Sequence, residues 1–296
     1  MAQEQQTMLG KMKPVFREDF GEIAPLVADN DGVLAPNPYL VYTTNYDFTF
    51  DENAGSSSIV VPANQSIRRI MSTDRRGVVD IRRIYGRATS SDLLLSIYDN
   101  EYNRFLMNRP VHFRNIAGSA INPFLLPIPM VIHQSQSIVF DITDLSGADN
   151  TLELALKGRR YYFDAFKEVF DRASNASRLS RPYFYTTDDA VDLQIGTQIQ
   201  SAYVTIVNDA DFYLYDIKGY SEGDFRVKTT SLSTGIAWQN GWIHSANFMG
   251  QGNEAPYFEP MIIERRTQLK FDFVNLSAAT NKIWLTLVGA HYYYPR

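Results

Sequence analysis

The feature that most constrains the fold of this chain is an internal repeat. Residues 129–163 align without a gap with residues 260–294, and 14 of the 35 pairs are identical. Each copy carries an apolar-Asp-apolar strand ending followed by Asx-Leu-Ser, as FDITDLSG from Phe140 and as FDFVNLSA from Phe271. A similarity of this length predicts two domains of one kind.

A second match, between PYLVYTT from Pro38 and PYFYTT from Pro182, is interpreted as the beginning of each copy. It predicts that the second copy is about a dozen residues shorter in its middle.

Each repeated end alternates apolar and polar residues on both sides of a polar turn. Ile138, Phe140 and Ile142 share one face before the turn DLSGADN, and the leucines of TLELALKG alternate after it. This pattern predicts two strands joined as a hairpin that closes each domain. IAWQNGWIH, residues 236–244, predicts a further hairpin with a two-residue Asn-Gly turn and a cross-strand tryptophan pair.

About seven or eight short strands per copy, without alternating long helices, predict an all-β protein. We expect two tandem antiparallel β-sandwich, jelly-roll-like domains, related by internal duplication and joined by a short helix that follows an extended N-terminal arm. Helical spacing of apolar residues around 162–179 locates that helix. The predicted boundaries are 1–37 for the arm, 38–163 for the first domain, 164–181 for the helical connector and 182–296 for the second domain.

Composition excludes several classes of function. The 296-residue chain contains no cysteine, which rules out thiol catalysis, disulfides and cysteine-based metal sites. A net charge of −5 argues against nucleic acid as the main partner. The longest apolar run, FLLPIPMVI from Phe124, contains two prolines and is too short to span a membrane, so no membrane association is expected.

The segment FLLPIPMVIHQSQSIVFDITDLSGADNTLELALKGRRYY resembles jelly-roll structural proteins of tailed bacteriophages. The resemblance covers roughly the last 35 to 40 residues of each copy. It implies a head-associated or head-to-tail protein of the virion, made in the host cytoplasm. A more distant likeness is to the double jelly-roll major capsid proteins of icosahedral, membrane-containing phages.

Motifs with chemical potential have structural interpretations in this sequence. None of the four histidines, His112, His133, His244 and His291, has metal-ligand spacing. GYSEG, residues 219–223, spells a nucleophile elbow but lies between strand-like flanks that predict a hairpin turn around Ser221. DNDG, residues 29–32, fails the calcium-loop pattern, and whether the acidic residues around 188–192 and 209–211 bind calcium stays open. No cofactor and no enzymatic activity are expected.

Three arginine doublets recur every seven residues, Arg68-Arg69, Arg75-Arg76 and Arg82-Arg83. Solvated side chains, contacts to a neighbouring subunit and contacts to packaged-genome phosphate are the three interpretations. Tyrosines at the end of each copy, and apolar residues in the arm, favour protein contact, although tyrosine-rich faces also bind sugars. The candidate interface residues are Arg68, Arg69, Arg75, Arg76, Arg82, Arg83, Phe16, Phe20, Tyr292 and Tyr294.

We therefore expect a homo-oligomer that contacts other virion proteins in the capsid, at a vertex or in the head-to-tail region. A carbohydrate-binding or receptor-binding β-sandwich protein is the alternative, and a double jelly-roll major capsid protein is the second alternative.

Overall fold

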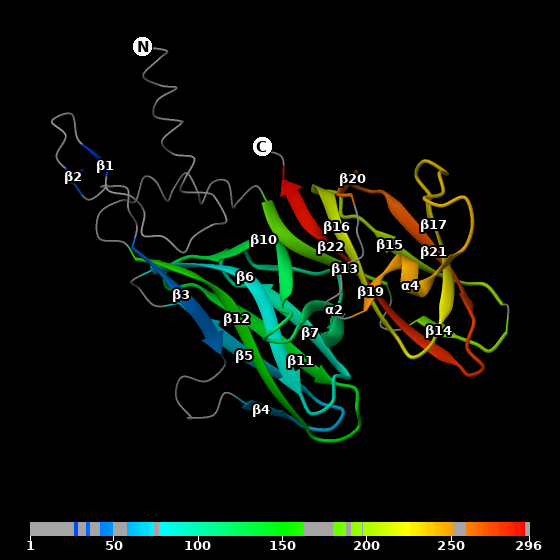
Figure 1. Cartoon of the computed structure of the whole chain (residues 1–296), viewed down its shortest axis with the longest axis horizontal. Helices are drawn as coiled ribbons and strands as arrows, with labels where there is room; N and C mark the ends of the chain where they lie inside the picture. Colours follow the sequence, from blue (N-terminus) through cyan, green and yellow to red (C-terminus); the bar gives the residue numbers. More distant parts are fainter. Residues whose placement is uncertain are drawn as a thin grey trace, which may run out of the picture.

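The computed structural model describes residues 27–28, 34–35, 42–49, 58–73, 77–162, 180–187, 191–196, 198–251 and 259–293 (Figure 1). The predicted helix of the connector and nearly all of the predicted arm lie outside these residues. Within the arm, the described strands β1 (Val27–Ala28) and β2 (Leu34–Ala35) pair with each other.

The first domain contains two facing antiparallel sheets. One sheet has the order β10 (Phe124–Ile132), β6 (Gly77–Ala88), β12 (Asn150–Tyr162) and β3 (Tyr42–Thr49), with β4 (Ser58–Val61) also paired to β12. The other has the order β5 (Ser66–Ser72), β11 (Ser137–Asp144), β7 (Leu93–Asp99) and β8 (Arg104–Phe105), with β9 (Val111–His112) paired to β7. Helix α2 (Phe113–Ile116) follows β9 directly.

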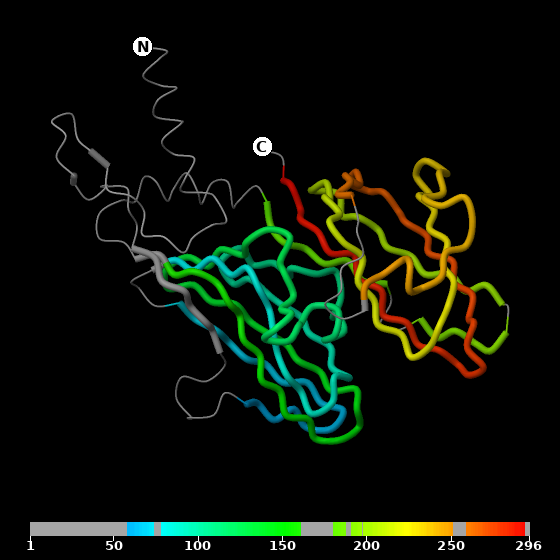
Figure 2. Tube along the Cα trace, in the orientation of Figure 1, coloured from blue at the N-terminus to red at the C-terminus, as the bar shows by residue number. Residues whose placement is uncertain are grey.

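The second domain repeats this arrangement in its main strands and differs in its short ones, because β19 is an additional strand that pairs parallel to β16. Its first sheet has the order β13 (Ser180–Thr186), β22 (Asn281–Tyr293), β16 (Ala210–Ser221) and β19 (Gly250–Gln251), with β14 (Val191–Leu193) on β22 and β20 (Met261–Ile263) on β16. Its second sheet has the order β15 (Gln200–Thr205), β21 (Gln268–Asn275), β17 (Phe225–Ser231) and β18 (Ile243–His244), and α4 (Ser245–Phe248) follows β18. Figure 2 shows that the chain completes the first domain before it builds the second.

The strand order identifies both domains as jelly rolls. In each copy the last strand lies between the first and third strands of one sheet, and the strand before it lies between the second and fourth strands of the other. The predicted fold, two tandem antiparallel sandwiches related by duplication, is confirmed. The individual domain boundaries remain a prediction.

The predicted closing hairpin is wrong in both copies. β11 and β12 belong to opposite sheets, as do β21 and β22, so the repeated turn is a corner that carries the chain across the sandwich. β16 and β17 flank the GYSEG segment in the same way and also lie in different sheets. A strand-turn-strand pattern is identical for a hairpin and for a corner, because only long-range pairing distinguishes them.

Two further local predictions are corrected by strand register. Tyr46 and Tyr183 occupy equivalent positions opposite Gly158 and Gly289, so the match that begins at Pro38 is displaced along the chain. The two copies are consequently closer in length than that match implied. In the Asn-Gly segment, residues 237 and 243–244 both pair with β17, so no cross-strand tryptophan pair forms there.

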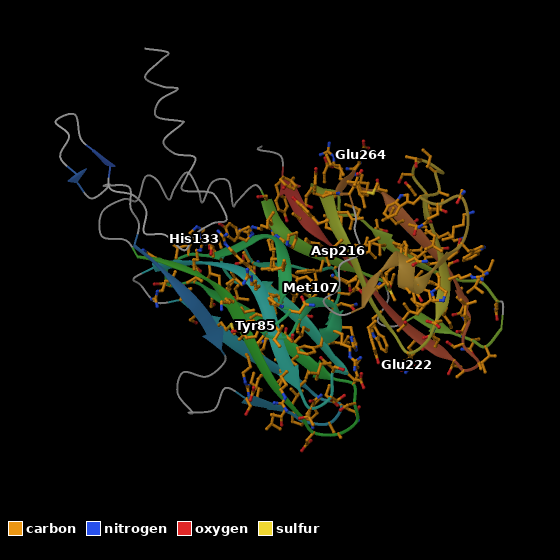
Figure 3. The ribbon with its side chains drawn as sticks, in the orientation of Figure 1. Tyr85, Met107, His133, Asp216, Glu222 and Glu264 are labelled. Atoms are coloured by element: carbon orange, nitrogen blue, oxygen red, sulfur yellow. The ribbon has the colours of Figure 1, made fainter. Side chains whose placement is uncertain are left out.

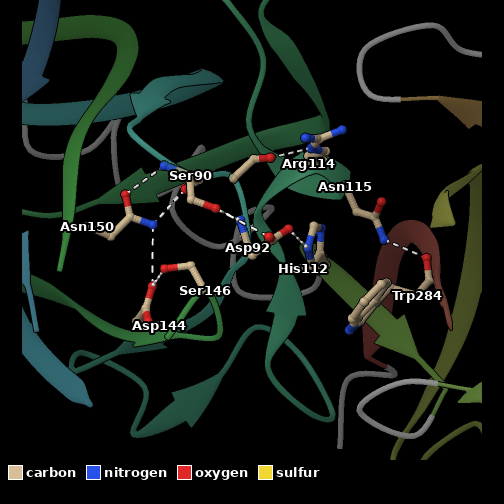
Figure 4. Close-up of polar contacts among 10 residues, drawn as sticks. Ser90, Asp92, His112, Arg114, Asn115, Asp144, Ser146, Asn150 and Trp284 are labelled. Carbon is tan, nitrogen blue, oxygen red and sulfur yellow. Dashed lines mark hydrogen bonds and ion pairs between the residues drawn. The ribbon is translucent and has the colours of Figure 1, made fainter. Parts of the chain in front are cut away.

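Buried asparagines explain why the polar turn is repeated. Asn150 accepts a hydrogen bond from the backbone N–H of Ser90 (3.0 Å) and donates one to its carbonyl (2.7 Å). Asn281 makes the same two bonds to Gly223, at 2.9 and 2.8 Å. In each domain one side chain therefore holds the β6–β7 or β16–β17 corner against the start of the last strand. Figure 4 shows the bonds between Asn150 and Ser90 in the first domain.

The Asx residue of Asx-Leu-Ser stabilises the neighbouring corner. Asp144 is buried and accepts two backbone N–H groups at 3.1 Å, while Asn275 is buried and accepts from the backbone of Ser277 at 2.9 Å. Desolvation acts to raise the pKa of Asp144, but hydrogen bonds from the backbone of Asn64 and from Ser146 and Asn150 outweigh it and lower the pKa.

A β-bulge at the same place in both copies explains why each carries glycine at the end of the pattern L-x-L-x-G, residues 154–158 and 285–289. Arg82 and Tyr215 are the extra residues, opposite Gly158 and Gly289. A Cβ atom on either glycine would overlap a backbone carbonyl oxygen of the facing strand. Glycine is thus required at both positions by close backbone approach.

Candidate functional site

The two jelly rolls are joined by an extensive, largely buried interface. Phe184 of β13 and Val288 of β22, both from the second domain, belong to the apolar core of the first domain. Phe184 is fully buried and its ring lies 5.9 Å from that of Phe124. The hydrophobic core therefore continues from one domain into the other, which fixes their relative position.

The first domain contributes a continuous segment, residues 104–116, which we call the first docking segment. It comprises β8, β9, α2 and the loop between the strands, and α2 lies between the domains in Figure 1. Met107 forms a bridge with Phe184, and its side chain lies between the two sandwiches in Figure 3.

Asn108 attaches this segment to the edge of the second domain. Its side-chain amide donates to the carbonyl of Thr186 (3.0 Å) and accepts from the N–H of Thr186 (2.8 Å). Its backbone N–H donates to the carbonyl of Phe184 at 3.2 Å. The side chain thus substitutes for a neighbouring strand at the free edge of β13.

His112 inserts its ring into an aromatic cluster of the second domain. The ring stacks on Tyr220 with 4.7 Å between centroids and 12° between planes, and it lies 4.7 Å from the ring of Trp284. Burial lowers the pKa of His112 to about 3, and the positive charge of Arg114 acts in the same direction. His112 is consequently neutral at physiological pH.

Asn115 and Arg181 complete the polar contacts. The fully buried Asn115 donates to the carbonyl of Trp284 (2.9 Å) and to the hydroxyl of Thr286 (3.0 Å), as Figure 4 shows for the first of these bonds. Arg181 forms a buried ion pair with Asp99 of the first domain at 2.7 Å. Nevertheless, desolvation raises the pKa of Asp99.

The predicted arginines do not form one surface. Arg68 and Arg69 lie exposed on β5, whereas Arg82 and Arg83 lie on β6 in the opposite sheet. Arg68 forms an exposed bidentate pair with Asp141 across the strands. Arg82 pairs with Asp80 at 2.7 Å, and Arg83 is exposed. Arg75 and Arg76 lie outside the described residues.

Tyr292 lies in an exposed aromatic surface of the second domain. Its hydroxyl is 3.4 Å from that of Tyr215, and its ring meets the ring of Tyr213 edge to face at 5.7 Å. These tyrosines line an open depression of about 700 Å³ together with Asp211, Pro260, Ile262 and Tyr293. The other predicted contact residues, Phe16, Phe20 and Tyr294, lie outside the described residues.

The four histidines are dispersed. His112 lies in the interface, His133 contacts Glu101 at 2.6 Å, His244 accepts from the backbone at the start of α4, and buried His291 stacks on Tyr183. Within the described ranges, no group of three His, Cys, Asp or Glu side chains is arranged to hold a metal ion. The calcium-loop candidate at residues 29–32 and the aspartates at 188 and 189 lie outside these ranges.

Two other sequence features have structural outcomes. Ser221 ends β16 and leads through a corner into β17, so the helix that a nucleophile elbow requires is replaced by a strand. Among the described residues, no helix has the length and apolar character needed to cross a membrane.

Sequence reasoning missed Asn108, His112 and Asn115, although a signal was present. Structural alignment places residues 236–248 on residues 104–116, because Thr230 pairs with Ala237 as Tyr98 pairs with Phe105. RFLMNRPVHFRNI and IAWQNGWIHSANF are identical at three positions only, and these are Asn108/Asn240, His112/His244 and Asn115/Asn247. A search for N-x₃-H-x₂-N would have located both segments.

Comparison with protein-family models gives no match, and comparison with curated proteins gives none either. Among solved structures, a triple jelly-roll turret protein of an archaeal virus is 11% identical with a TM-score of 0.22, over 81% of this chain and 60% of that one. The VP2 subviral particle of infectious bursal disease virus is 11% identical with a TM-score of 0.23, over 95% and 50%.

A third solved structure, the CUB1-EGF-CUB2 region of rat MASP-1, is 10% identical with a TM-score of 0.23, over 82% of this chain and 96% of that one. This chain thus spans 60% and 50% of the two viral proteins. Scores of this size carry no argument, and the assignment of the jelly-roll fold rests on the strand order.

Proposed function

We propose that this chain is a non-enzymatic structural protein of a bacteriophage particle that self-associates and contacts other virion proteins. The observation that carries the proposal is the interface between its domains. One jelly roll docks the end of its sandwich onto the outer sheet face of a second copy of the same fold. The surfaces of the two partners are different, so the contact is heterologous and can be repeated.

Further support comes from the exposed surface that the two domains leave uncovered. Ile262, at 59% exposure, and Tyr292, at 40%, lie in the aromatic surface of the second domain, and Arg83 is exposed on the first. Aromatic and arginine side chains are enriched where proteins contact each other. The proposed location is the capsid, a vertex or the head-to-tail region, and a double jelly-roll major capsid protein is one form of this proposal.

Light scattering coupled to size exclusion tests this function, at low and high salt and with and without calcium. A discrete oligomer or a larger assembly is the expected result. A monomer of 33.7 kDa at all protein concentrations and under all of these conditions would contradict it. Deletion of residues 1–37 is expected to weaken assembly while leaving the circular dichroism of the sandwiches unchanged, and normal assembly would exclude a role for the arm.

Carbohydrate binding is the second candidate, because the depression around Tyr213, Tyr215 and Tyr292 combines aromatic rings with the carboxylate of Asp211. Aromatic faces with a few polar groups are suited to sugar rings. A glycan array measures this directly. Binding that is lost in Tyr292→Ala would support the second candidate, and an array without signal would remove it.

A further inference from the structure

The second docking segment, residues 236–248, retains the three residues that join the domains but is not used in that way within the chain. Asn240 and Asn247 are exposed, whereas their equivalents Asn108 and Asn115 bond to the second domain. His244 accepts a hydrogen bond from the backbone N–H of Ala246 at 3.3 Å and is only partly buried.

The two histidines show what docking changes. His112 makes no hydrogen bond to the helix that follows it and instead fills the space between two aromatic rings of the other domain. His244, at the equivalent place, turns back and caps its own helix. The side chain of Trp242, two residues before His244, is 39% exposed. It therefore presents a large apolar surface beside the exposed amides of Asn240 and Asn247.

The receiving face also exists twice. In the second domain it is the outer face of β16 and β22, where Tyr220 lies opposite Trp284 and Thr286 follows two residues later. In the first domain the equivalent face belongs to β6 and β12, where Arg87 lies opposite Glu153 and Ala155 takes the place of Thr286. Arg87 and Glu153 are exposed, and Tyr85 on the same face is labelled in Figure 3.

We propose that the second docking segment binds the outer face of β6 and β12 in a second copy of this chain. The contact repeats between chains the one that joins the two domains within a chain. This inference rests on the proposed function, since it identifies the surfaces through which the protein self-associates. Asn240, His244 and Asn247 take the positions that Asn108, His112 and Asn115 occupy inside the chain.

The chemistry of the receiving face differs in a way that suits a contact between chains. His112 packs against Tyr220 and Trp284, whereas His244 packs against Arg87 and Glu153 of the partner copy. A planar guanidinium stacks on an aromatic ring, and a carboxylate accepts from an imidazole N–H. The charged side chains on the outer face of β6 and β12 keep the free chain soluble before it assembles. Trp242 supplies the aromatic side chain that is buried in the contact.

A head-to-tail contact of this kind relates each domain to the next by the same rotation. Repeating it generates a closed ring when a whole number of these rotations completes a full turn, and a helical filament when it does not. Each chain contributes two successive positions that share one fold. The assembly is therefore expected to have twice as many jelly-roll positions as chains.

The absence of native cysteine allows a direct test by disulfide cross-linking. Asn115 bonds to the carbonyl of Trp284 within the chain, so the corresponding pair between chains is Asn247→Cys in one protein and Glu153→Cys, at an exposed position, in another. The two single variants are mixed and oxidised, and covalent dimers are measured by non-reducing electrophoresis. The matched control replaces Glu153→Cys by Ser72→Cys, which is also exposed but lies on the opposite sheet of the first domain.

The Asn247/Glu153 mixture is expected to give about fivefold or more covalent dimer than the control mixture, because docking raises the effective concentration of the two thiols. Trp242→Ala is expected to shift the light-scattering mass toward the monomer without changing the circular dichroism. This inference would be overturned, and the proposed function left intact, if the protein assembles but gives no more cross-linked dimer than the control mixture and keeps its mass in Trp242→Ala. Absence of assembly in the unmodified protein would contradict both.

Discussion

The sharpest stability prediction concerns Asn281, which clamps the β16–β17 corner of the second domain. Its side chain is fully buried, and it accepts from the N–H of Gly223 at 2.9 Å and donates to the carbonyl of Gly223 at 2.8 Å. Asn281→Ala removes both bonds and leaves both backbone groups of Gly223 without these partners. The longer contact of the same amide to the carbonyl of Asp224, at 3.4 Å, is lost as well.

The expected cost follows from these contacts. Two hydrogen bonds contribute about 1 kcal/mol each, and backbone groups left without partners add about 1 kcal/mol or more. Because Gly223 is only partly buried, water reaches part of the corner and reduces the second contribution. Asn281→Ala is therefore expected to lower the free energy of unfolding by about 2 to 3 kcal/mol.

Urea unfolding followed by tryptophan fluorescence measures this change, since all three tryptophans, Trp238, Trp242 and Trp284, lie in the second domain. Ser277→Ala is the matched control at the same turn, because this hydroxyl makes an exposed 3.3 Å bond to the carbonyl of Asp224. Its expected cost is below about 1 kcal/mol.

An Asn281→Ala protein as stable as Ser277→Ala would refute the clamp. Asn281→Asp separates hydrogen bonding from volume, because the carboxylate keeps the shape but cannot donate to the carbonyl of Gly223. It is expected to destabilise at least as much as Asn281→Ala, and a neutral result would show that packing, rather than hydrogen bonding, matters at this position.

Three further predictions follow from the same structure. Burial holds the pKa of both His112 and His291 at about 3, below the ordinary 6.5, so protons bind the unfolded chain more strongly and stability falls as pH drops from 6.5 toward 3. Each histidine is expected to lower the free energy of unfolding by about 2 kcal/mol at pH 5 relative to pH 7.5, and equal urea midpoints at the two pH values would contradict this. Gly289→Ala is expected to cost about 3 kcal/mol or more in urea unfolding because its Cβ overlaps a backbone carbonyl, while Gly241→Ala, whose Cβ meets no atom within 4 Å, is the tolerated control. Arg181→Ala leaves a buried carboxylate on β7 unpaired and is expected to lower the thermal midpoint strongly, by the equivalent of about 3 kcal/mol, whereas an unchanged midpoint would show that the ion pair adds nothing to the interface.

The fold was largely predictable because its strongest signals are periodic. Alternation along FDITDL and LELAL predicted strands with Phe140, Leu152 and Leu154 inside, and these three side chains are buried. Because the sequence repeat relates the two copies, the sandwich predicted for one copy was also predicted for the other. The pairing of those strands was not predictable by the same means, since β11 and β12 adjoin in sequence but pair with strands about 40 to 120 residues away.

The candidate site was less accessible from sequence for a related reason. The arginine doublets are prominent because they recur every seven residues, yet the two doublets that the structure describes, Arg68-Arg69 and Arg82-Arg83, lie on strands of opposite sheets. Asn108 and Asn115 look like ordinary loop polar residues, and their role depends on Thr186 and Trp284, which are 78 and 169 residues away. The shared asparagines and histidine can be found in the sequence only when residues 104–116 are aligned with residues 236–248.

The two copies differ on their outer sheet faces in a way that fits the contact proposed between chains. Inside the chain, the docking face carries Tyr220 and Trp284 and the interface forms once, together with the core, so its apolar groups are not exposed to water after folding. At the equivalent place in the first domain, Arg87 and Glu153 remain exposed in the described part of the monomer. The proposed contact, which would form after folding and between chains, would account both for Asn240, His244 and Asn247 and for the charged side chains on the outer face of β6 and β12. Glu153→Trp together with Arg87→Tyr gives this face the aromatic residues of the second domain. The double variant is therefore expected to aggregate visibly at low salt. A variant that stays soluble and assembles normally would show that the charges on this face do not keep the free chain soluble.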